Sequence, residues 1–188
     1  MHFMHAANVS SLLRTFDDPS DGAAIKSLEL ILMVLECSPN PFSRTQFTPG
    51  HITCTGLVLA PDGEKMLMVH HRRLNRWLLP GGHVEPGDAE IWDAARREVV
   101  EETGAQLVAS PAPILASLDV HCIPAGKGEP YHLHHDIVFH FRADADETRL
   151  SQESRAIAWC APPDFDRYAV PNNVRRAYAR VRKLSSGR

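Results

Sequence analysis

The spacing of apolar residues changes near residue 50. Before that point, apolar residues such as Val9, Leu13 and Phe16 recur three or four positions apart, as along one face of a helix. The pattern predicts helices over residues 1–16 and 23–37, the second ended by prolines that cannot continue it. We expect residues 1–46 to form an N-terminal helical extension. It either packs on the rest of the chain or builds a homodimer contact, and the sequence does not decide between these.

From His51 onward the pattern is typical of strands. Residues 51–60 and 65–71 are rich in β-branched and apolar side chains, and Pro61-Asp62-Gly63 between them predicts a hairpin. Further strands are predicted at 114–123, 131–143 and 156–160, and further helices at 89–103 and 172–184. This order predicts a single α/β (α+β) domain over residues 47–188.

Composition narrows the class of protein. The 188 residues are 44% hydrophobic and 23% charged, as in ordinary globular proteins with one core. The net charge of −3 gives no overall basic field, so nucleic acid is not an expected partner. The four cysteines are far apart in the sequence, which argues against a zinc ribbon or disulfide scaffold and suits a reducing compartment.

No segment predicts contact with a membrane. The longest apolar run, residues 28–35, is interrupted by Glu29 and is far shorter than the ~20 residues that span a bilayer. The N-terminus also lacks the basic and then apolar pattern of a signal peptide. We therefore expect a cytoplasmic protein.

Glutamates gather on one face of the predicted helix over residues 89–103. At 3.6 residues per turn, Glu98, Glu101 and Glu102 fall within an arc of roughly 100°. Like charges at this spacing repel one another, and a divalent cation such as Mg²⁺ relieves the repulsion. An acidic face exposed to solvent is the alternative for this pattern alone.

The glutamates belong to a longer motif that begins at Gly81-Gly82. The segment Gly82–Ala105 resembles the Nudix box, G-x5-E-x7-R-E-U-x-E-E-x-G-U, in which U is a bulky apolar residue. The matching positions are Gly82, Arg97, Glu98, Val99, Glu101, Glu102 and Gly104. Asp88 replaces a glutamate, the gap between Asp88 and Arg97 is one residue longer than usual, and the last apolar residue is the small Ala105.

The resemblance implies a fold and an activity. Nudix proteins form an α/β/α sandwich around a mixed β-sheet, and Nudix hydrolases cleave a nucleoside diphosphate linked to another group with Mg²⁺ or Mn²⁺. By position, Glu98, Glu101, Glu102 and the carbonyl of Gly81 or Gly82 become metal ligands. Arg97, four residues before Glu101, could hold that carboxylate in place.

The base that takes a proton from water is less defined by the resemblance. In the family it comes from the helix, here Glu101 or Glu102, or from a glutamate on a later loop. Glu153 is the candidate on such a loop, and an ordinary exposed acid is the alternative.

Basic residues precede the Gly-Gly turn. Arg72, Arg73 and Arg76 should lie near the metal site, where guanidinium groups could bind phosphate oxygens of the substrate. A loop exposed to solvent is the competing interpretation.

Histidines are concentrated on the predicted strand over residues 131–143. Alternation places His132, His134 and Asp136 on one face of the strand and His135 on the other. We predict that His134 and Asp136 contact substrate, and the alternative is that they are strand residues whose polar groups are satisfied within the fold. A zinc site made from His132, His134 and Asp136, with or without His121, is a further alternative, although no short-spaced cysteine pair or H-E-x-x-H element supports it.

Together these features predict a metal-dependent Nudix hydrolase that cleaves a phosphoanhydride bond by water attack on phosphorus. The expected partner is a small nucleotide or another diphosphate. The alternative is a non-catalytic sensor that uses the same fold to bind a nucleotide. The intact acidic triad favours the enzyme, and the sequence leaves the substrate open.

Overall fold

The computed structural model describes residues 4–109, 113–126, 128–152 and 154–186. Its helices are α1 (Ala6–Leu13), α2 (Gly22–Cys37), α3 (Ile91–Thr103) and α4 (Asn172–Ser186), with a short 3₁₀ helix at Pro162–Asp164. Its strands are β1 (Gly50–Leu59), β2 (Met66–His71), β3 (Arg76–Leu78), β4 (Gly81–His83), β5 (Ile114–Ile123), β6 (His132–Arg142) and β7 (Ser154–Cys160).

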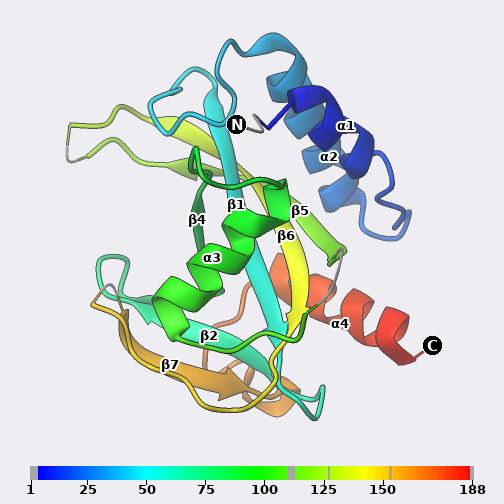
Figure 1. Cartoon of the computed structure of the whole chain (residues 1–188), viewed down its shortest axis with the longest axis vertical. Coiled ribbons are helices and arrows are strands. Elements are labelled where there is room, and N and C mark those ends of the chain that lie inside the picture. The colour runs from blue at the N-terminus through cyan, green and yellow to red at the C-terminus, as the bar shows by residue number, and fades with distance from the viewer. Residues whose placement is uncertain (1–3, 110–112, 127, 153, 187–188) are drawn as a thin grey trace.

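The strands form one mixed sheet centred on β1 (Figure 1). One edge of β1 runs parallel to β6, which pairs antiparallel with β5. The other edge pairs antiparallel with β4 and then, at Leu59, with β2. Strand β2 continues away from β1 and pairs with β3 and β7.

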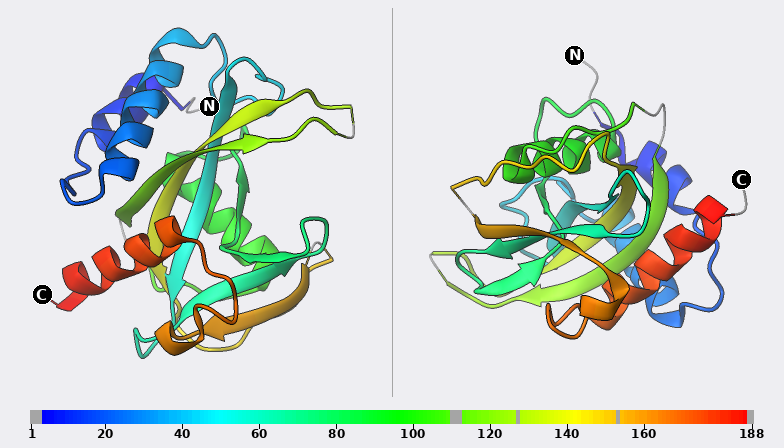
Figure 2. Two further views of the ribbon diagram at one scale, coloured as in Figure 1. Left: turned by 180° about the vertical axis from the view of Figure 1, so that it is seen from behind. Right: turned by 90° about the horizontal axis from the view of Figure 1, so that it is seen from below.

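Each face of the sheet has its own hydrophobic core. Because side chains alternate along a strand, Ile52 and Val58 of β1 enter a core shared with α1, α2 and α3. Leu57 and Leu59 enter a second core, which α4 covers with Tyr178 and neighbouring side chains. The views in Figure 2 show α3 and α4 on different sides of the sheet. The sandwich and its mixed sheet confirm the predicted fold class.

The N-terminal helices pack on the sheet. Val9, Leu13 and Ile31 are buried in the same core as α3. Helix α1 is shorter than predicted, since the chain already turns at Arg14, and residues 1–3 lie outside the described residues. Leu30 and Met33 of α2 are 44% and 59% exposed, and a homodimer contact through this extension stays a prediction.

The predicted hairpin is correct only at its turn. Ala60 donates its N–H to the Lys65 carbonyl at 2.9 Å and Leu59 pairs with Met66, after which β1 and β2 diverge. The divergence leaves room beside β1 for β4 and places Gly81-Gly82 against the middle of the sheet.

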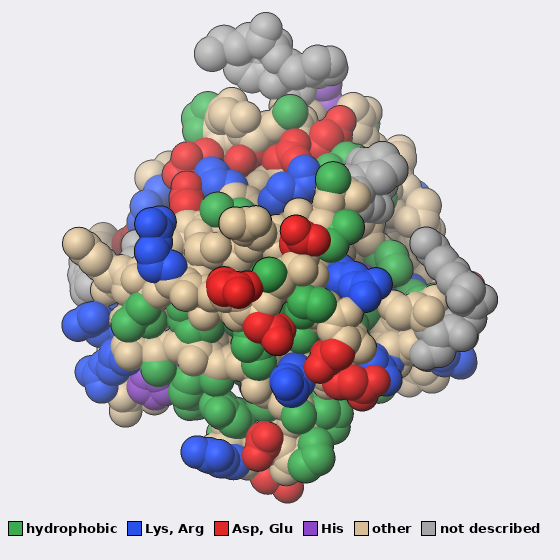
Figure 3. Space-filling view, turned by 60° about the horizontal axis from the view of Figure 1, so that its bottom comes forward, with side chains coloured by type: hydrophobic (Ala, Val, Ile, Leu, Met, Phe, Trp, Pro, Cys, Tyr) green, Lys and Arg blue, Asp and Glu red, His purple; other side chains and the backbone are tan. Residues whose placement is uncertain are grey.

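The basic residues of α4 form ion pairs with other elements. The pairs are Arg175–Asp166, Arg176–Asp21, Arg180–Asp18 and Arg182–Glu64. These contacts connect α4 to the segment that precedes it, to the turn before α2 and to the β1–β2 turn, so they serve packing. On the face shown in Figure 3, acidic and basic side chains are interspersed. Among the residues described, no helix has the length and apolar character required to cross a bilayer.

Candidate active site

A cavity of about 1770 Å³ runs from the acidic edge of α3, past β4, onto the face of the sheet that carries α4. Its volume exceeds the ~300–1,000 Å³ typical of small-molecule sites, so a nucleotide fits. At one end it is lined by residues of the Nudix-like motif, namely Gly81, Gly82, Asp88, Glu98, Glu101 and Glu102.

Arg97 organises this end of the cavity. Its Nε and Nη2 each donate to one carboxylate oxygen of Asp88, both at 3.1 Å. Its Nη1 donates to Glu98 at 2.9 Å and to Glu101 at 3.2 Å. Hydrogen bonding to Asp88, followed by that to Glu98, raises the pKa of Arg97 despite partial burial. The predicted Arg97–Glu101 pair is therefore present, within a larger network.

The longer spacing between Asp88 and Arg97 is absorbed in the loop before α3. Asp88 accepts the N–H of Glu85 at 2.8 Å, while Asp93 accepts that of Glu90 at 3.0 Å at the start of the helix. Asp88 still reaches Arg97 with both oxygens, which gives the substituted aspartate the position of a loop organiser.

Close packing explains the two glycines of β4. A Cβ on Gly82 would lie 2.5 Å from the carboxylate carbon of Glu98. A Cβ on Gly81 would lie 2.5 Å from Oγ1 of Thr55 on β1. At Gly81 the Cβ would also lie 2.7 Å from the backbone oxygen of Cys54, so only a residue without a side chain lets β4 lie this close to β1, whereas at Gly82 the neighbour is the movable end of the Glu98 side chain.

The three glutamates offer oxygen ligands of the kind that Mg²⁺ and Mn²⁺ prefer. Glu98 and Glu101 are turned toward Arg97, and Glu102 is only 7% exposed. All three line the cavity beside Gly81 and Gly82, so the donor set fits a hard divalent ion. Binding one ion with all three carboxylates would require changes of side-chain rotamer, because their oxygens do not form a group within 4.8 Å of one another; among the described residues only His51, His132 and His134 do so.

The floor of the cavity contains residues that the motif did not indicate. Thr53 and Thr55 of β1 donate to the same oxygen of Asp136, at 3.0 and 2.9 Å. Burial raises the pKa of Asp136. The alternation of polar His51, Thr53 and Thr55 with apolar neighbours was the signal in the sequence that could have identified this face.

Histidines also line the cavity, among them His83 of β4, His121 of β5 and His134 of β6. The register places His51, His134 and His121 in one row across β1, β6 and β5. Burial lowers the pKa of His134 to about 2 and that of His83, on β4, to about 4. His121 differs, because its hydrogen bond to Asp119 at 2.9 Å raises its pKa.

The side chains of β6 lie on the faces of the sheet that the alternation predicted. His134 and Asp136 line the cavity, whereas His135 does not. The zinc alternative named Asp136, yet this carboxylate is held by the two threonines. The third imidazole that joins His132 and His134 comes instead from His51 on β1.

The predicted arginines lie along the cavity wall. Arg72, Arg73 and Arg76 all contribute to its lining, and Arg72 donates from Nη2 to the Ser154 carbonyl at 3.3 Å. Glu153, the proposed base on a loop, lies outside the described residues.

Sequence comparison connects this geometry to known proteins. A family profile described as the NUDIX domain matches residues 50–181. A protein of Bacillus subtilis (strain 168), provisionally named an 8-oxo-dGTP diphosphatase, is 30% identical over 120 residues, covering 64% of this chain and 73% of that protein. The nucleoside triphosphatase NudI of Escherichia coli O1:K1 is 32% identical over 113 residues, covering 58% of this chain and 77% of NudI.

Solved structures agree on the fold. An Ap4A hydrolase of C. elegans superposes with a TM-score of 0.53 at 20% identity, over 73% of this chain and 98% of that one. The MutT protein of Methanosarcina mazei Go1 superposes with a TM-score of 0.50 at 22% sequence identity, over 71% of this chain and 94% of that protein. With the family profile spanning most of the chain and the motif assembled on one cavity, this protein belongs to the Nudix hydrolase family.

Proposed function

We propose that this chain hydrolyses a phosphoanhydride bond of a nucleoside triphosphate or another nucleoside diphosphate-linked compound, with Mg²⁺ or Mn²⁺ as cofactor. Residues 47–188 would carry the reaction and residues 1–46 would serve as an extension. The relatives named as nucleoside triphosphatase and 8-oxo-dGTP diphosphatase support nucleotides as the first compounds to test.

The observation that carries the proposal is the network around Arg97. One guanidinium holds Glu98 and Glu101 beside the buried Glu102, all on the wall of a cavity large enough for a nucleotide. With the carbonyl of Gly81, these carboxylates would hold the divalent ion. When bound, such an ion neutralises phosphate charge and lowers the pKa of a coordinated water.

The chain's own groups orient the reactants. Arg97 sets the direction of two glutamates and, through its bond to the His83 carbonyl at 2.8 Å, also fixes β4. Water attacks one phosphorus, the bridging P–O bond breaks, and the departing phosphate leaves with the bond's electron pair. The proton of the water passes to a carboxylate, for which Glu101, Glu102 and Glu153 are the candidates.

The substrate would extend from the acidic end across the sheet. Arg72, Arg73 and Arg76 would bind phosphate oxygens at the rim, while His134 and Asp136 would contact the substrate from the floor. Because rim contacts are formed in both the ground state and the transition state, Arg76→Ala should raise KM more than it lowers kcat. An unchanged KM would refute the phosphate contact.

The direct test is a screen for released phosphate and pyrophosphate. Nucleoside triphosphates, nucleoside diphosphate sugars and dinucleoside polyphosphates would be offered with Mg²⁺ and with Mn²⁺. We expect turnover that falls by about 10²-fold or more in Glu101→Gln and Glu102→Gln. The exposed Glu29 of α2 supplies the control, since Glu29→Gln should leave turnover unchanged.

Two results would overturn the proposal. Full activity in both glutamate variants would show that Glu101 and Glu102 are not needed for the reaction. Tight nucleotide binding without product under either metal would instead support a sensor built on the same fold.

A further inference from the structure

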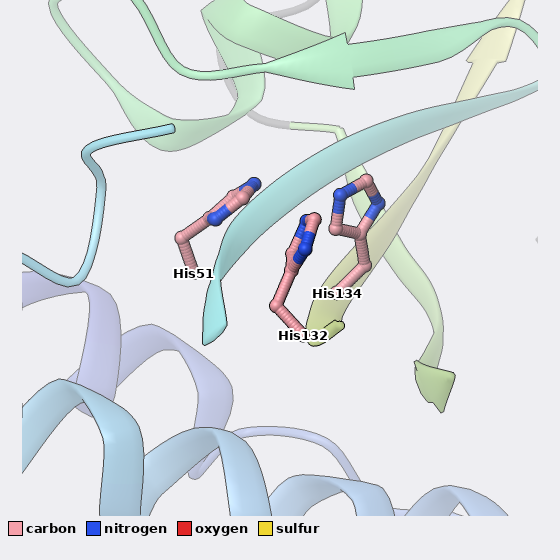
Figure 4. Close-up of side chains that lie close together, drawn as sticks. All are labelled: His51, His132 and His134. Carbon is pink, nitrogen blue, oxygen red and sulfur yellow. The ribbon is translucent and has the colours of Figure 1, made fainter. Parts of the chain in front are cut away.

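Three histidines converge at the N-terminal ends of β1 and β6. The ligand nitrogens of His51, His132 and His134 all lie within 4.8 Å of one another. In Figure 4 the three rings lie side by side, His51 from β1 and the other two from β6. The parallel register explains this, because His51 pairs with His134 and His132 precedes His134 by two residues on the same face.

Two of the rings are oriented by backbone carbonyls. Nδ1 of His51 lies 3.1 Å from the Gln46 carbonyl, and Nδ1 of His132 lies 2.8 Å from the Pro130 carbonyl. A carbonyl only accepts, so each Nδ1 must carry the hydrogen and donate it, which leaves the Nε2 lone pair available. Metal-binding histidines use this same arrangement, in which an outer carbonyl fixes the ring and its tautomer.

The Nε2 of His51 is the strongest single indication of a ligand. It is buried, and the described part of the chain offers it no hydrogen-bond partner. A buried polar atom left without a partner costs about 1–3 kcal/mol. The His51 and His132 rings are stacked with their centroids 5.1 Å apart, but stacking does not give the Nε2 lone pair a partner. A bound cation would give it one.

We propose that His51, His132 and His134 bind one Zn²⁺ or a similar first-row divalent ion, at a site separate from the glutamates of α3. Imidazole nitrogen suits Zn²⁺, whereas carboxylate oxygen suits Mg²⁺, so the histidine cluster and the glutamates of α3 favour different ions. Zn–N bonds of about 2.0–2.1 Å in a tetrahedron place ligand nitrogens about 3.4 Å apart. The present spacing extends to within 4.8 Å, so the rings would have to move closer together to share one ion.

The site adjoins the catalytic end through His83. The His83 ring lies 5.1 Å from that of His51 and 5.5 Å from that of His134, between ring centroids. Its carbonyl accepts from Arg97 at 2.8 Å. Three histidine ligands leave a fourth position for His83 or water, on the side where His134 lines the cavity.

The test is a Zn²⁺ titration of chelator-treated protein by calorimetry, with millimolar Mg²⁺ present throughout. We expect one equivalent of Zn²⁺ to bind, and His134→Gln to weaken binding at least about tenfold. His140 lies on the same strand outside the cluster, so His140→Gln serves as the matched control. Glu102→Gln should also leave Zn²⁺ affinity unchanged while lowering turnover by about 10²-fold or more, which separates this site from the proposed hydrolytic one.

Co²⁺ gives a second measurement on the unaltered protein, in case a variant does not fold. Intense visible absorption typical of tetrahedral Co²⁺, lost on addition of Zn²⁺, would support the site. Three results would overturn it: no Zn²⁺ binding by the unaltered protein, equal affinity in His134→Gln, or loss of binding in Glu102→Gln.

Discussion

Replacing Arg97 by methionine should destabilise the protein severely. The Arg97 side chain is 20% exposed and the Asp88 side chain 5%, so the substitution leaves a buried carboxylate without its cation. Removing one partner of a buried pair costs about 3–5 kcal/mol. We expect about 3 kcal/mol here because Arg97 retains some contact with water. For a chain of this length that loss lowers Tm by on the order of 10 °C.

The measurement is urea unfolding followed by circular dichroism. Arg96→Met is the matched control, since Arg96 neighbours Arg97 on α3 but pairs with Asp93 at 3.5 Å between side chains 37% and 31% exposed. Such surface pairs contribute about 0–1 kcal/mol. Adding Asp88→Asn to Arg97→Met should recover much of the loss, because it removes the unpaired charge. Equal destabilisation by Arg97→Met and Arg96→Met would refute the reasoning.

Two further substitutions test how β4 packs on β1 and how the N-terminal extension is held on α4. Gly81→Ala should lower the free energy of unfolding by about 1–3 kcal/mol and reduce turnover, because the added methyl would lie 2.7 Å from the backbone oxygen of Cys54, which cannot turn aside as a side chain can. Asp21→Ala should lower it by about 2 kcal/mol, because Asp21 caps α2 through the Ala24 N–H at 3.1 Å and accepts from Arg176 at 2.8 Å. Both changes can be measured by urea unfolding.

Each has a control in the same chain. Gly87→Ala should be nearly neutral, since a Cβ there meets nothing within 4 Å. Asp166→Ala removes an ion pair in which the Asp166 side chain is 92% exposed. It should therefore lower the free energy of unfolding by less than Asp21→Ala does. If Gly81→Ala unfolds like Gly87→Ala, β4 does not lie against β1 as described. If Asp21→Ala matches Asp166→Ala, the extension is not held through α4.

The long elements could be predicted because their periodicity extends over many residues. Helix α2 and strands β5 and β6 lie within a residue or two of their predicted bounds. Strands β3 and β4 have three residues each, too few to show a period, and they form only because β2 and β1 offer edges for pairing. Strand β7 begins at Ser154, before the predicted residue 156.

The acidic end of the site could be predicted in more detail than the rest. Glu98, Glu101 and Arg97 are neighbours on one helix, so spacing alone placed them together. The Asp136 contacts with Thr53 and Thr55, and the approach of His51 to His134, depend on the parallel register of β1 and β6. Register between strands far apart in sequence is fixed by the whole sheet, and periodicity along one strand does not reveal it.

Anomalous X-ray diffraction from crystals soaked with Mn²⁺ and a slowly hydrolysed nucleotide analogue tests the central claim most directly. The account predicts a manganese peak bounded by the carboxylates of Glu98, Glu101 and Glu102 and the carbonyl of Gly81, in contact with the phosphates. A nucleotide seated in the cavity with no manganese at these carboxylates, or with manganese only at the histidines, would contradict it.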